Sequence, residues 1–391
     1  MIDLGTPCSR PQNNQETPPL PRPSLAPIAA TLPETVPFVG PEALERRSGQ
    51  TFLARLGANE SPFGAAPAAL RAMATALPQA WQYGDPQSHD LRHALALHHG
   101  VASDEIVIGE GIDGLLGLAV RLFAAPDATV VTSLGAYPTL NYHAIGFGAR
   151  VVSVPYRDNV EDLAALAATA RRENAAIVYL ANPDNPMGSW HASEAVEQFI
   201  DAIAPTTLIL LDEAYGEFAP AGTLPPLDTA RPNLLRLRTF SKAHGMAGLR
   251  CGYAIGERQT IRAFERVRNH FGVNAIAQAG ALAALAAPDH LDQVVKATAA
   301  ARSRIADIAM RSGLTPLPSA TNFVTIDCGR DAGFAADLLA ALAARRVFIR
   351  KPMATGLDHC IRISVGTAAA LDVLADALPR AMAGLPPRPA G

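Results

Sequence analysis

The chain has 391 residues, with 33 Lys and Arg against 36 Asp and Glu and a net charge of −3. This near-balance excludes a nucleic-acid-binding protein that depends on a broad basic face, so we expect no nucleic-acid partner. Since a single hydrophobic core rarely grows beyond about 250–300 residues, we expect more than one domain.

Membrane and secretory proteins are not indicated either. No apolar run approaches the roughly 18–20 residues that cross a bilayer, and residues 1–15 lack the basic and apolar regions of a secretory signal. The four cysteines, Cys8, Cys251, Cys328 and Cys360, are far apart and form no CxxC pair. We therefore predict a cytoplasmic protein with reduced cysteines and no membrane partner.

Both ends of the chain differ from its centre. Residues 1–41 contain ten prolines and show no hydrophobic periodicity. Such composition is typical of an extended, unfolded segment, so we predict a Pro-rich disordered arm over residues 1–44. A short Pro-rich tail is predicted over residues 385–391.

Short apolar runs then alternate with helical patterns. The runs are typical of strands that are buried on both faces, and they cover residues 105–108, 129–132, 176–180, 207–211 and 234–237. Helical patterns lie between several of them, at residues 115–123, at 160–172 behind Asn159 as a candidate cap, and at 193–203. This order predicts an α/β fold with a mostly parallel central sheet covered by helices.

The sequence pattern changes after about residue 280. Ala-rich helical segments there alternate with apolar runs at 322–326, 346–350 and 360–365. We predict a large domain over residues 81–280. A smaller α/β domain is predicted from residues 45–80 together with 281–384.

The first candidate site is the GxGxxG sequence of residues 109–114, between a predicted strand and a predicted helix. Glycines let the backbone approach an anion, and a helix N-terminus offers unpaired N–H groups. A dinucleotide site also needs an acidic residue at the end of the next strand, where Thr132-Ser133-Leu134-Gly135 has none. Phosphate binding is therefore the favoured interpretation, and a nicotinamide-nucleotide site stays an alternative.

Three further groups of polar residues follow predicted strands. They are the turn-rich loop Asn182–Gly188, the carboxylate Asp212 with Tyr215, and the run Arg238–Arg250, which contains Lys242. Because sites gather at the carboxyl ends of parallel strands, these groups are expected to lie close together. A lysine in a desolvated pocket favours the neutral amine that forms a Schiff base, and Ser, Thr and Arg bind phosphate.

The joint pattern resembles the fold-type I enzymes that depend on pyridoxal 5′-phosphate (PLP), and among the class I and II aminotransferases it is closest to the histidinol-phosphate aminotransferase group. The resemblance covers roughly residues 50–380. The motifs that carry it are Ala58-Asn59-Glu60-Ser61-Pro62, Tyr83-Gly84-Asp85-Pro86, Asn182–Gly188, Asp212-Glu213-Ala214-Tyr215, Arg238–Gly252 and Ile361–Thr367.

The resemblance implies the following roles. Lys242 holds the PLP aldehyde as a Schiff base and moves protons, Asp212 pairs with the ring nitrogen, and Tyr215 and Asn185 bind the phenolic oxygen. Tyr137 stacks on the ring. The remaining residues hold the PLP phosphate: Gly111, Ile112, Asp113, Thr239, Ser241 and Arg250, with Tyr83 reaching the phosphate of a neighbouring subunit, which implies a homodimer.

Three residues are candidates for substrate binding. Arg362 lies between apolar neighbours and needs an anionic partner, which the resemblance implies to be the substrate carboxylate. Arg350 matches an arginine that the group uses for the substrate phosphate, although a surface arginine is nearly as good an interpretation. Asn59 belongs to the first motif.

Three functions stay open. The first is a transaminase that exchanges an amino group between an amino acid or amino phosphate and 2-oxoglutarate. The second is a PLP-dependent decarboxylase of the threonine-phosphate type, which shares nearly all of these motifs. The third is the nicotinamide-dependent oxidoreductase. We predict no metal site, because His89 and His93 lack further ligands around them.

Overall fold

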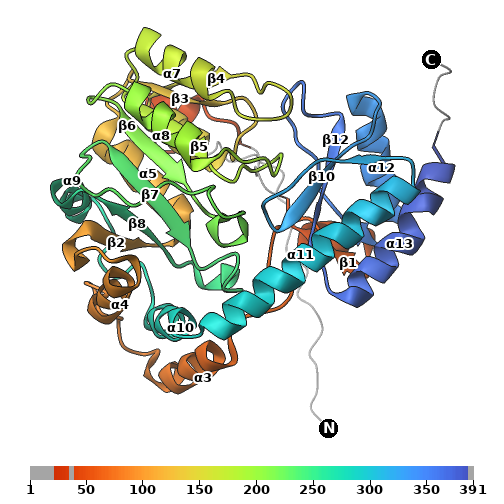
Figure 1. Ribbon diagram of the computed structural model, residues 1–391, viewed down its shortest axis with the longest axis horizontal. Helices are drawn as coiled ribbons and strands as arrows, with labels where there is room; N and C mark the ends of the chain where they lie inside the picture. The colour runs from red at the N-terminus through yellow and green to blue at the C-terminus, as the bar shows by residue number, and fades with distance from the viewer. Residues whose placement is uncertain (1–21, 35–38, 386–391) are drawn as a thin grey trace, which may run out of the picture.

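The computed structural model describes residues 22–34 and 39–385, and it contains three sheets (Figure 1). Its helices are α1 (Pro27–Ala30), α2 (Pro41–Ser48), α3 (Pro67–Ala76), α4 (His89–His99), α5 (Gly111–Phe123), α6 (Thr139–Gly146), α7 (Leu163–Arg172), α8 (Ser193–Ala202), α9 (Arg258–Ala263), α10 (Ala275–Leu285), α11 (Pro288–Arg311), α12 (Ala332–Ala344) and α13 (Ala368–Ala383). Its strands are β1 (Ala54–Arg55), β2 (Ile106–Gly109), β3 (Thr129–Ser133), β4 (Arg150–Val154), β5 (Ile177–Ala181), β6 (Leu208–Asp212), β7 (Leu234–Thr239), β8 (Gly252–Gly256), β9 (Thr315–Pro316), β10 (Phe323–Asp327), β11 (Val347–Phe348) and β12 (Cys360–Ser364).

The largest sheet has seven strands in the order β2-β8-β7-β6-β5-β3-β4. Strands β4, β3, β5, β6 and β7 run parallel to one another. Strand β8 is antiparallel to both of its neighbours, β7 and β2. The predicted α/β fold with a mostly parallel sheet is therefore confirmed. The carboxyl ends of β5, β6 and β7 lie side by side, and this edge carries the predicted site.

Alternate residues of the central strands pack on opposite faces of this sheet. Val130 lies in the core cluster with α5 and α6, whereas the next residue, Val131, packs with α7 and α8 on the other face. This alternation explains the continuous apolar runs, since both faces of each strand are covered. A third cluster joins α3, α4 and α10 to the β2–β8 end of the sheet.

A smaller unit holds the other two sheets, β12-β10-β9 and the parallel pair β1-β11. It packs against α11, α12 and α13, and the long helix α11 joins it to the seven-stranded part in Figure 1. Strand β1 thus ties the start of the described chain to its C-terminal part. Ala69 of α3 packs with Ala277 and Ala281 of α10, on the side of the large sheet. The domain boundaries themselves stay a prediction.

The predicted disordered arm of residues 1–44 is wrong at its C-terminal end. Helix α2 begins at Pro41, with Gly40 as its N-cap, and the short helix α1 begins at Pro27. Proline favours the first helical position because its fixed φ suits the helix and its missing N–H is not needed there. Residues 1–21 and 35–38 of the arm, and 386–391 of the predicted tail, lie outside the described residues.

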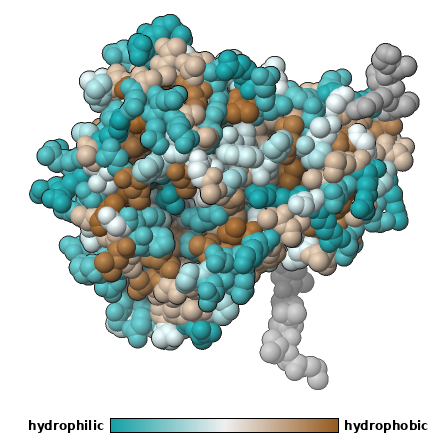
Figure 2. Space-filling view, in the orientation of Figure 1, coloured by the Kyte–Doolittle hydropathy of each residue, from teal (hydrophilic) through white to brown (hydrophobic). Residues whose placement is uncertain are grey.

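Helices in the described part of the chain lack the combination of length and apolar character that a membrane span requires. On the face shown in Figure 2, hydrophobic residues occur in small patches that are separated by hydrophilic ones. That the protein has no membrane partner stays a prediction.

A buried ion pair stabilises the centre of the large sheet. Glu213 is fully buried and accepts hydrogen bonds from Arg236 Nε at 2.9 Å and from Arg238 Nε at 2.8 Å. Replacing Glu213 by Gln leaves buried guanidinium charge without an anion, so we expect the free energy of unfolding to fall by about 3–5 kcal/mol.

Urea denaturation measures this loss, with Glu173→Gln as the matched control. Glu173 pairs with an exposed Arg150 at 3.0 Å, and a surface pair contributes only about 0–1 kcal/mol. Equal losses in the two variants would contradict the account.

Candidate active site

A cavity of about 290 Å³ lies at the carboxyl ends of β5, β6 and β7. It collects side chains from segments that are far apart in the sequence. Ten of the residues predicted for the site line it: Ile112, Asp113, Tyr137, Asn185, Asp212, Tyr215, Thr239, Ser241, Lys242 and Arg250. The motifs that the sequence analysis singled out therefore meet in one place.

Lys242 lies in the loop after β7, and its amine faces the cavity. Its Nζ donates a hydrogen bond to the backbone oxygen of Asn59 at 3.2 Å and lies 5.6 Å from the centre of the Tyr215 ring. Burial, followed by the positive charge of Arg362, lowers the pKa of Lys242 to about 8. A useful fraction of this amine is therefore neutral near neutral pH, as a nucleophile requires.

Asp212 ends β6 and is only 5 % exposed. Its Oδ1 accepts a hydrogen bond from the backbone N–H of Ala214 at 2.9 Å, and its Oδ2 accepts one from the Tyr179 hydroxyl at 2.7 Å. Burial raises the pKa of Asp212 to about 6, while these two hydrogen bonds oppose the rise. The carboxylate is consequently ionised at neutral pH and can face a cationic group.

An anion site lies at the start of α5, where the predicted glycine motif ends β2 and begins the helix. Gly111 has φ +75°, a left-handed conformation that favours glycine, and a Cβ atom there would lie 2.7 Å from Arg250 Nη2. Thr239 and Ser241 bring hydroxyls to the same cavity, and their oxygens are 3.0 Å apart. Arg250 supplies the positive charge and pairs with Asp113 at 3.1 Å.

A polar network connects the cavity with the smaller unit. Asn59 Nδ2 donates to the Tyr215 hydroxyl at 3.1 Å. From β12, Arg362 donates to Asn185 Oδ1, and its Cζ lies 5.1 Å from the centre of the Phe323 ring. Arg362 Nε is buried and has no hydrogen-bond partner among the described residues. A buried guanidinium with a free donor is a natural site for a carboxylate.

Tyr137 contributes an aromatic ring to the cavity wall. Burial and the nearby negative charge of Asp113 raise the pKa of Tyr137 to about 12, so its hydroxyl stays protonated at neutral pH.

Five predicted residues do not line the cavity, namely Gly111, Asn59, Arg362, Tyr83 and Arg350, and the last two lie outside the network just described. Tyr83 is 82 % exposed, and its ring lies 4.6 Å from that of Phe271. Arg350 pairs with Arg362 through a backbone bridge, but its Nη2 donates to the backbone oxygen of Val39 at 2.7 Å. Their predicted roles, with a neighbouring subunit and with a substrate phosphate, stay predictions.

The residues of the cavity fit PLP group by group. The Lys242 amine suits the PLP aldehyde, and the buried Asp212 carboxylate suits the ring nitrogen. The start of α5, together with Ser241 and Arg250, suits the phosphate. Residues 53–378 match the family model described as aminotransferase class I and II. The chain belongs to this aminotransferase family.

Individual relatives agree with this assignment. Histidinol-phosphate aminotransferase 2 from Ralstonia nicotianae is 37% identical over 338 residues, which cover 85% of this chain and 90% of the relative. The crystal structure of histidinol-phosphate aminotransferase from Sinorhizobium meliloti in complex with PLP has a TM-score of 0.89 and 52% identity, and covers 92% of this aminotransferase and 97% of that chain. The predicted family, fold type and enzyme class, a PLP-dependent aminotransferase, are confirmed.

One similar structure belongs to the alternative activity. L-threonine-O-3-phosphate decarboxylase from Porphyromonas gingivalis has a TM-score of 0.73 but is only 21% identical, covering 84% of this chain and 98% of that one. This likeness shows the shared fold and does not extend to the reaction.

The nicotinamide alternative does not fit the sheet of this aminotransferase. In a dinucleotide-binding fold the strand before the glycine motif lies beside the next strand of its βαβ unit. Here β2 pairs with β8, whereas β3 lies between β4 and β5 on the far side of the sheet. The helix N-terminus at Gly111 therefore lacks the neighbouring strand that supplies the ribose site of a dinucleotide fold.

Three polar residues in or near the cavity wall, Tyr179, Tyr156 and Glu161, were not predicted from the sequence. Tyr179 donates to Asp212, and Tyr156 donates to Asp184 at 2.9 Å, close to the buried Glu161. Burial and the neighbouring Asp184 raise the pKa of Glu161 well above its usual range. The hydroxyl of Tyr179 is the one polar side-chain group in the apolar run of residues 177–181, and it is the only sequence signal that could have indicated a role for this residue.

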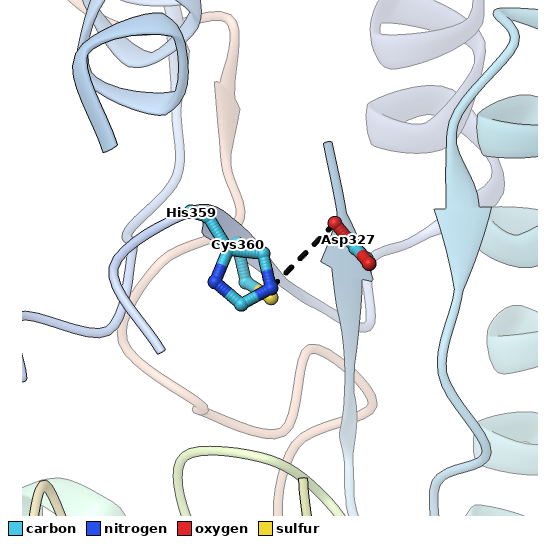
Figure 3. A group of neighbouring side chains, drawn as sticks. All are labelled: Asp327, His359 and Cys360. Carbon is cyan, nitrogen blue, oxygen red and sulfur yellow. Dashed lines mark ion pairs between the residues drawn. The ribbon is translucent and has the colours of Figure 1, made fainter. Parts of the chain in front are cut away.

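A second cluster with metal-ligating side chains lies in the smaller unit of the aminotransferase (Figure 3). Asp327 Oδ1 and His359 Nε2 are 3.6 Å apart, and Cys360 lies beside them. Asp327 Oδ1 already accepts the backbone N–H of Gly329 at 2.7 Å, and burial raises the pKa of Cys360 to about 12. Without a metal ion, the cluster is an Asp–His pair beside a buried thiol.

The lowered pKa of Lys242 predicts how the cofactor-free aminotransferase takes up PLP. Since only the neutral amine attacks an aldehyde, the rate should rise about tenfold per pH unit below pH 8 and level off above it. The absorbance change on mixing the apoprotein with PLP measures this rate. A rate that goes on rising to pH 10, as for an ordinary lysine, would be inconsistent with a desolvated Lys242.

Proposed function

We propose that this chain transfers an amino group between histidinol phosphate and 2-oxoglutarate, with PLP bound in the cavity. The observation that carries the proposal is that the Lys242 amine and the Asp212 carboxylate line the same cavity. The names of the most similar relatives support the choice of histidinol phosphate. We further propose a cytoplasmic location, in keeping with cysteines that have no disulfide spacing.

When bound, PLP supplies an aldehyde that takes up the substrate amine and a ring that accepts the electrons released at the substrate carbon. Asp212, ionised and buried, holds a proton on the ring nitrogen. Lys242, with its lowered pKa, is the group that removes a proton at the substrate carbon and returns it at the cofactor carbon. Tyr215 and Asn185 are assigned to the phenolic oxygen.

The start of α5 and the loop after β7 bind the cofactor phosphate in this proposal. Backbone N–H groups of Ile112 and Asp113 point from a helix N-terminus, where anions are stabilised. The hydroxyls of Thr239 and Ser241 and the guanidinium of Arg250 complete the set. With the phosphate held by these residues, Lys242 would be the residue for the aldehyde and Asp212 the residue for the ring nitrogen.

Arg362 is assigned to the substrate carboxylate. Its unpartnered Nε and its bond to Asn185, a residue that lines the cavity, support this assignment. Arg350, bridged to Arg362 through the backbone, is assigned to the phosphate of histidinol phosphate. Arginines that bind either anion let one pocket accept both substrates in turn.

We also propose a homodimer. Tyr83 does not line the cavity of its own chain and is 82 % exposed. Its ring contacts that of Phe271, which is 53 % exposed, and the nearby residues Trp81 and Leu77 are 80 % and 59 % exposed. Large apolar side chains gathered on a surface favour a protein–protein interface. A second copy would cover them and bring Tyr83 to the neighbouring site.

Replacing Arg362 by Lys tests the carboxylate assignment. Because hydrogen bonds to charged groups contribute about 1.5–3 kcal/mol, we expect the KM for 2-oxoglutarate to rise about 10- to 100-fold, with a smaller change in kcat. Arg304→Lys, at a surface pair with Asp372, is the control and should leave the KM unchanged. A change in kcat alone would overturn the assignment.

Single-turnover assays test the proposed reaction. The PLP form is mixed with histidinol phosphate, an aromatic amino acid or threonine phosphate, and conversion to the pyridoxamine form is followed by absorbance. Histidinol phosphate should convert it fastest. Carbon dioxide release from threonine phosphate, without conversion of the cofactor, would instead establish the decarboxylase.

A further inference from the structure

The hydroxyl of Tyr179 lies inside the wall of the cavity and touches Asp212. Tyr179 is in the middle of β5, is 1 % exposed, and lines the cavity with its ring. Its hydroxyl donates to Asp212 Oδ2 at 2.7 Å, and both groups are buried. This is a short hydrogen bond to a carboxylate, a kind that is stronger than bonds between neutral groups.

The sheet register explains why these residues meet. Ala181 of β5 is paired with Asp212 of β6, so Tyr179 and Asp212 belong to the same face of two neighbouring parallel strands. That face packs against α5 and carries Leu210 and Ala181 as well. A tyrosine side chain is long enough to reach along the strand from position 179 to the carboxylate at the strand end.

The surroundings of Asp212 disfavour its ionised form, so a hydrogen-bond donor is needed to stabilise the carboxylate. Beyond burial, Asp113 and Glu213 add negative charge that raises the pKa of Asp212, and Glu161 is close enough to Asp212 and Asp184 for their charges to raise its own pKa. Lys242 and Arg250 are the basic residues that line the cavity. The hydroxyl of Tyr179 and the N–H of Ala214 oppose the effect of burial, since donors favour the ionised carboxylate.

The two bonds also fix the direction of the carboxylate. Ala214 holds Oδ1 and Tyr179 holds Oδ2, so rotation of the carboxyl group would break both. The remaining lone pairs can therefore face the cavity in one orientation only.

We propose that Tyr179 is a positioning residue, which acts through Asp212 to aim an ionised carboxylate at the ring nitrogen of the cofactor. The inference rests on the proposed function, because it requires PLP in this cavity. It predicts that Tyr179 determines how strongly the protein prefers a cofactor ring that contains nitrogen.

The test compares PLP with its 1-deaza analogue, which carries CH in place of the ring nitrogen. Dissociation constants for both are measured by absorbance with the full-length wild type, Tyr179→Phe and Tyr156→Phe. The Tyr156 hydroxyl is the matched control, because it donates to Asp184 instead of Asp212. We expect the preference for PLP over the analogue to fall about tenfold in Tyr179→Phe and to stay at the wild-type value in Tyr156→Phe.

Tyr179→Phe leaves the buried Asp212 carboxylate with one donor fewer and could therefore fold poorly. A second variant keeps the proposal testable in that case. The double variant Tyr179→Phe/Asp212→Asn removes that charge and should show the same preference as Asp212→Asn alone. An unchanged preference in Tyr179→Phe, an equal fall in Tyr156→Phe, or a further fall in the double variant would overturn the proposal. Failure of the proposed function has a different result: the wild type itself would not bind PLP.

Discussion

Lys242→Ala is expected to abolish amino-group transfer, with a loss of about 10³-fold or more in the single-turnover rate. The variant removes the amine that holds the aldehyde and moves the proton, and positioned general bases alone contribute about 10²–10⁴-fold. The chain has only three lysines, Lys242, Lys296 and Lys351, and of these only Lys242 lines the cavity.

Lys296→Ala is the control, because Lys296 lies on α11 and does not line the cavity. This variant should transfer amino groups at the wild-type rate. Wild-type turnover by Lys242→Ala would show that another group performs the chemistry assigned to this amine.

Asp212→Asn is expected to reduce the single-turnover rate by about 10²–10³-fold, the effect of removing one preorganised charged group. An amide keeps the size of the side chain but cannot hold a proton on the ring nitrogen, so the ring accepts electrons poorly. The fold should be retained, since the amide oxygen can still accept the hydrogen bond from Ala214, and the Tyr179 hydroxyl can rotate to accept one from the amide NH2 group.

The rate of amino-group transfer from histidinol phosphate measures this effect. Asp327→Asn is the control because Asp327 belongs to the separate cluster in the smaller unit. If Asp212→Asn kept more than a tenth of the wild-type rate, the ring nitrogen would not depend on this carboxylate.

The central strands could be predicted from the sequence because both of their faces are buried, which makes them continuously apolar. Two strands of the seven-stranded sheet have no such signal. β4 lies at the edge of the sheet with partly exposed residues, and β8 begins and ends with glycine. Their pairing with neighbouring strands depends on contacts between segments that are far apart in the sequence, and a local hydrophobic pattern does not indicate such contacts.

The start of α7 shows the limit of local signals. Asn159 was the expected cap, but it has φ +64°, and the helix begins after Asp162, whose side chain accepts the N–H of Ala165 at 3.0 Å. Both residues are good caps by type. The short bridge between Arg157 and Val160 uses the residues around Asn159 in a turn instead.

The site was predictable where its residues follow strands in the sequence, as Asp212 and Lys242 do. Tyr179 was not, because its apolar ring fits the strand pattern and only its hydroxyl takes part in the site. The contact of Asn59 with both Tyr215 and Lys242 likewise depends on how the smaller unit packs on the large sheet.

The most direct test of the account is to reduce the PLP-loaded protein with borohydride and map the modified peptide by mass spectrometry. We predict a phosphopyridoxyl group on Lys242 and none on Lys296 or Lys351. Modification of either of the other two lysines, with Lys242 unmodified, would contradict the claim that the Lys242 amine and the Asp212 carboxylate act on one bound cofactor.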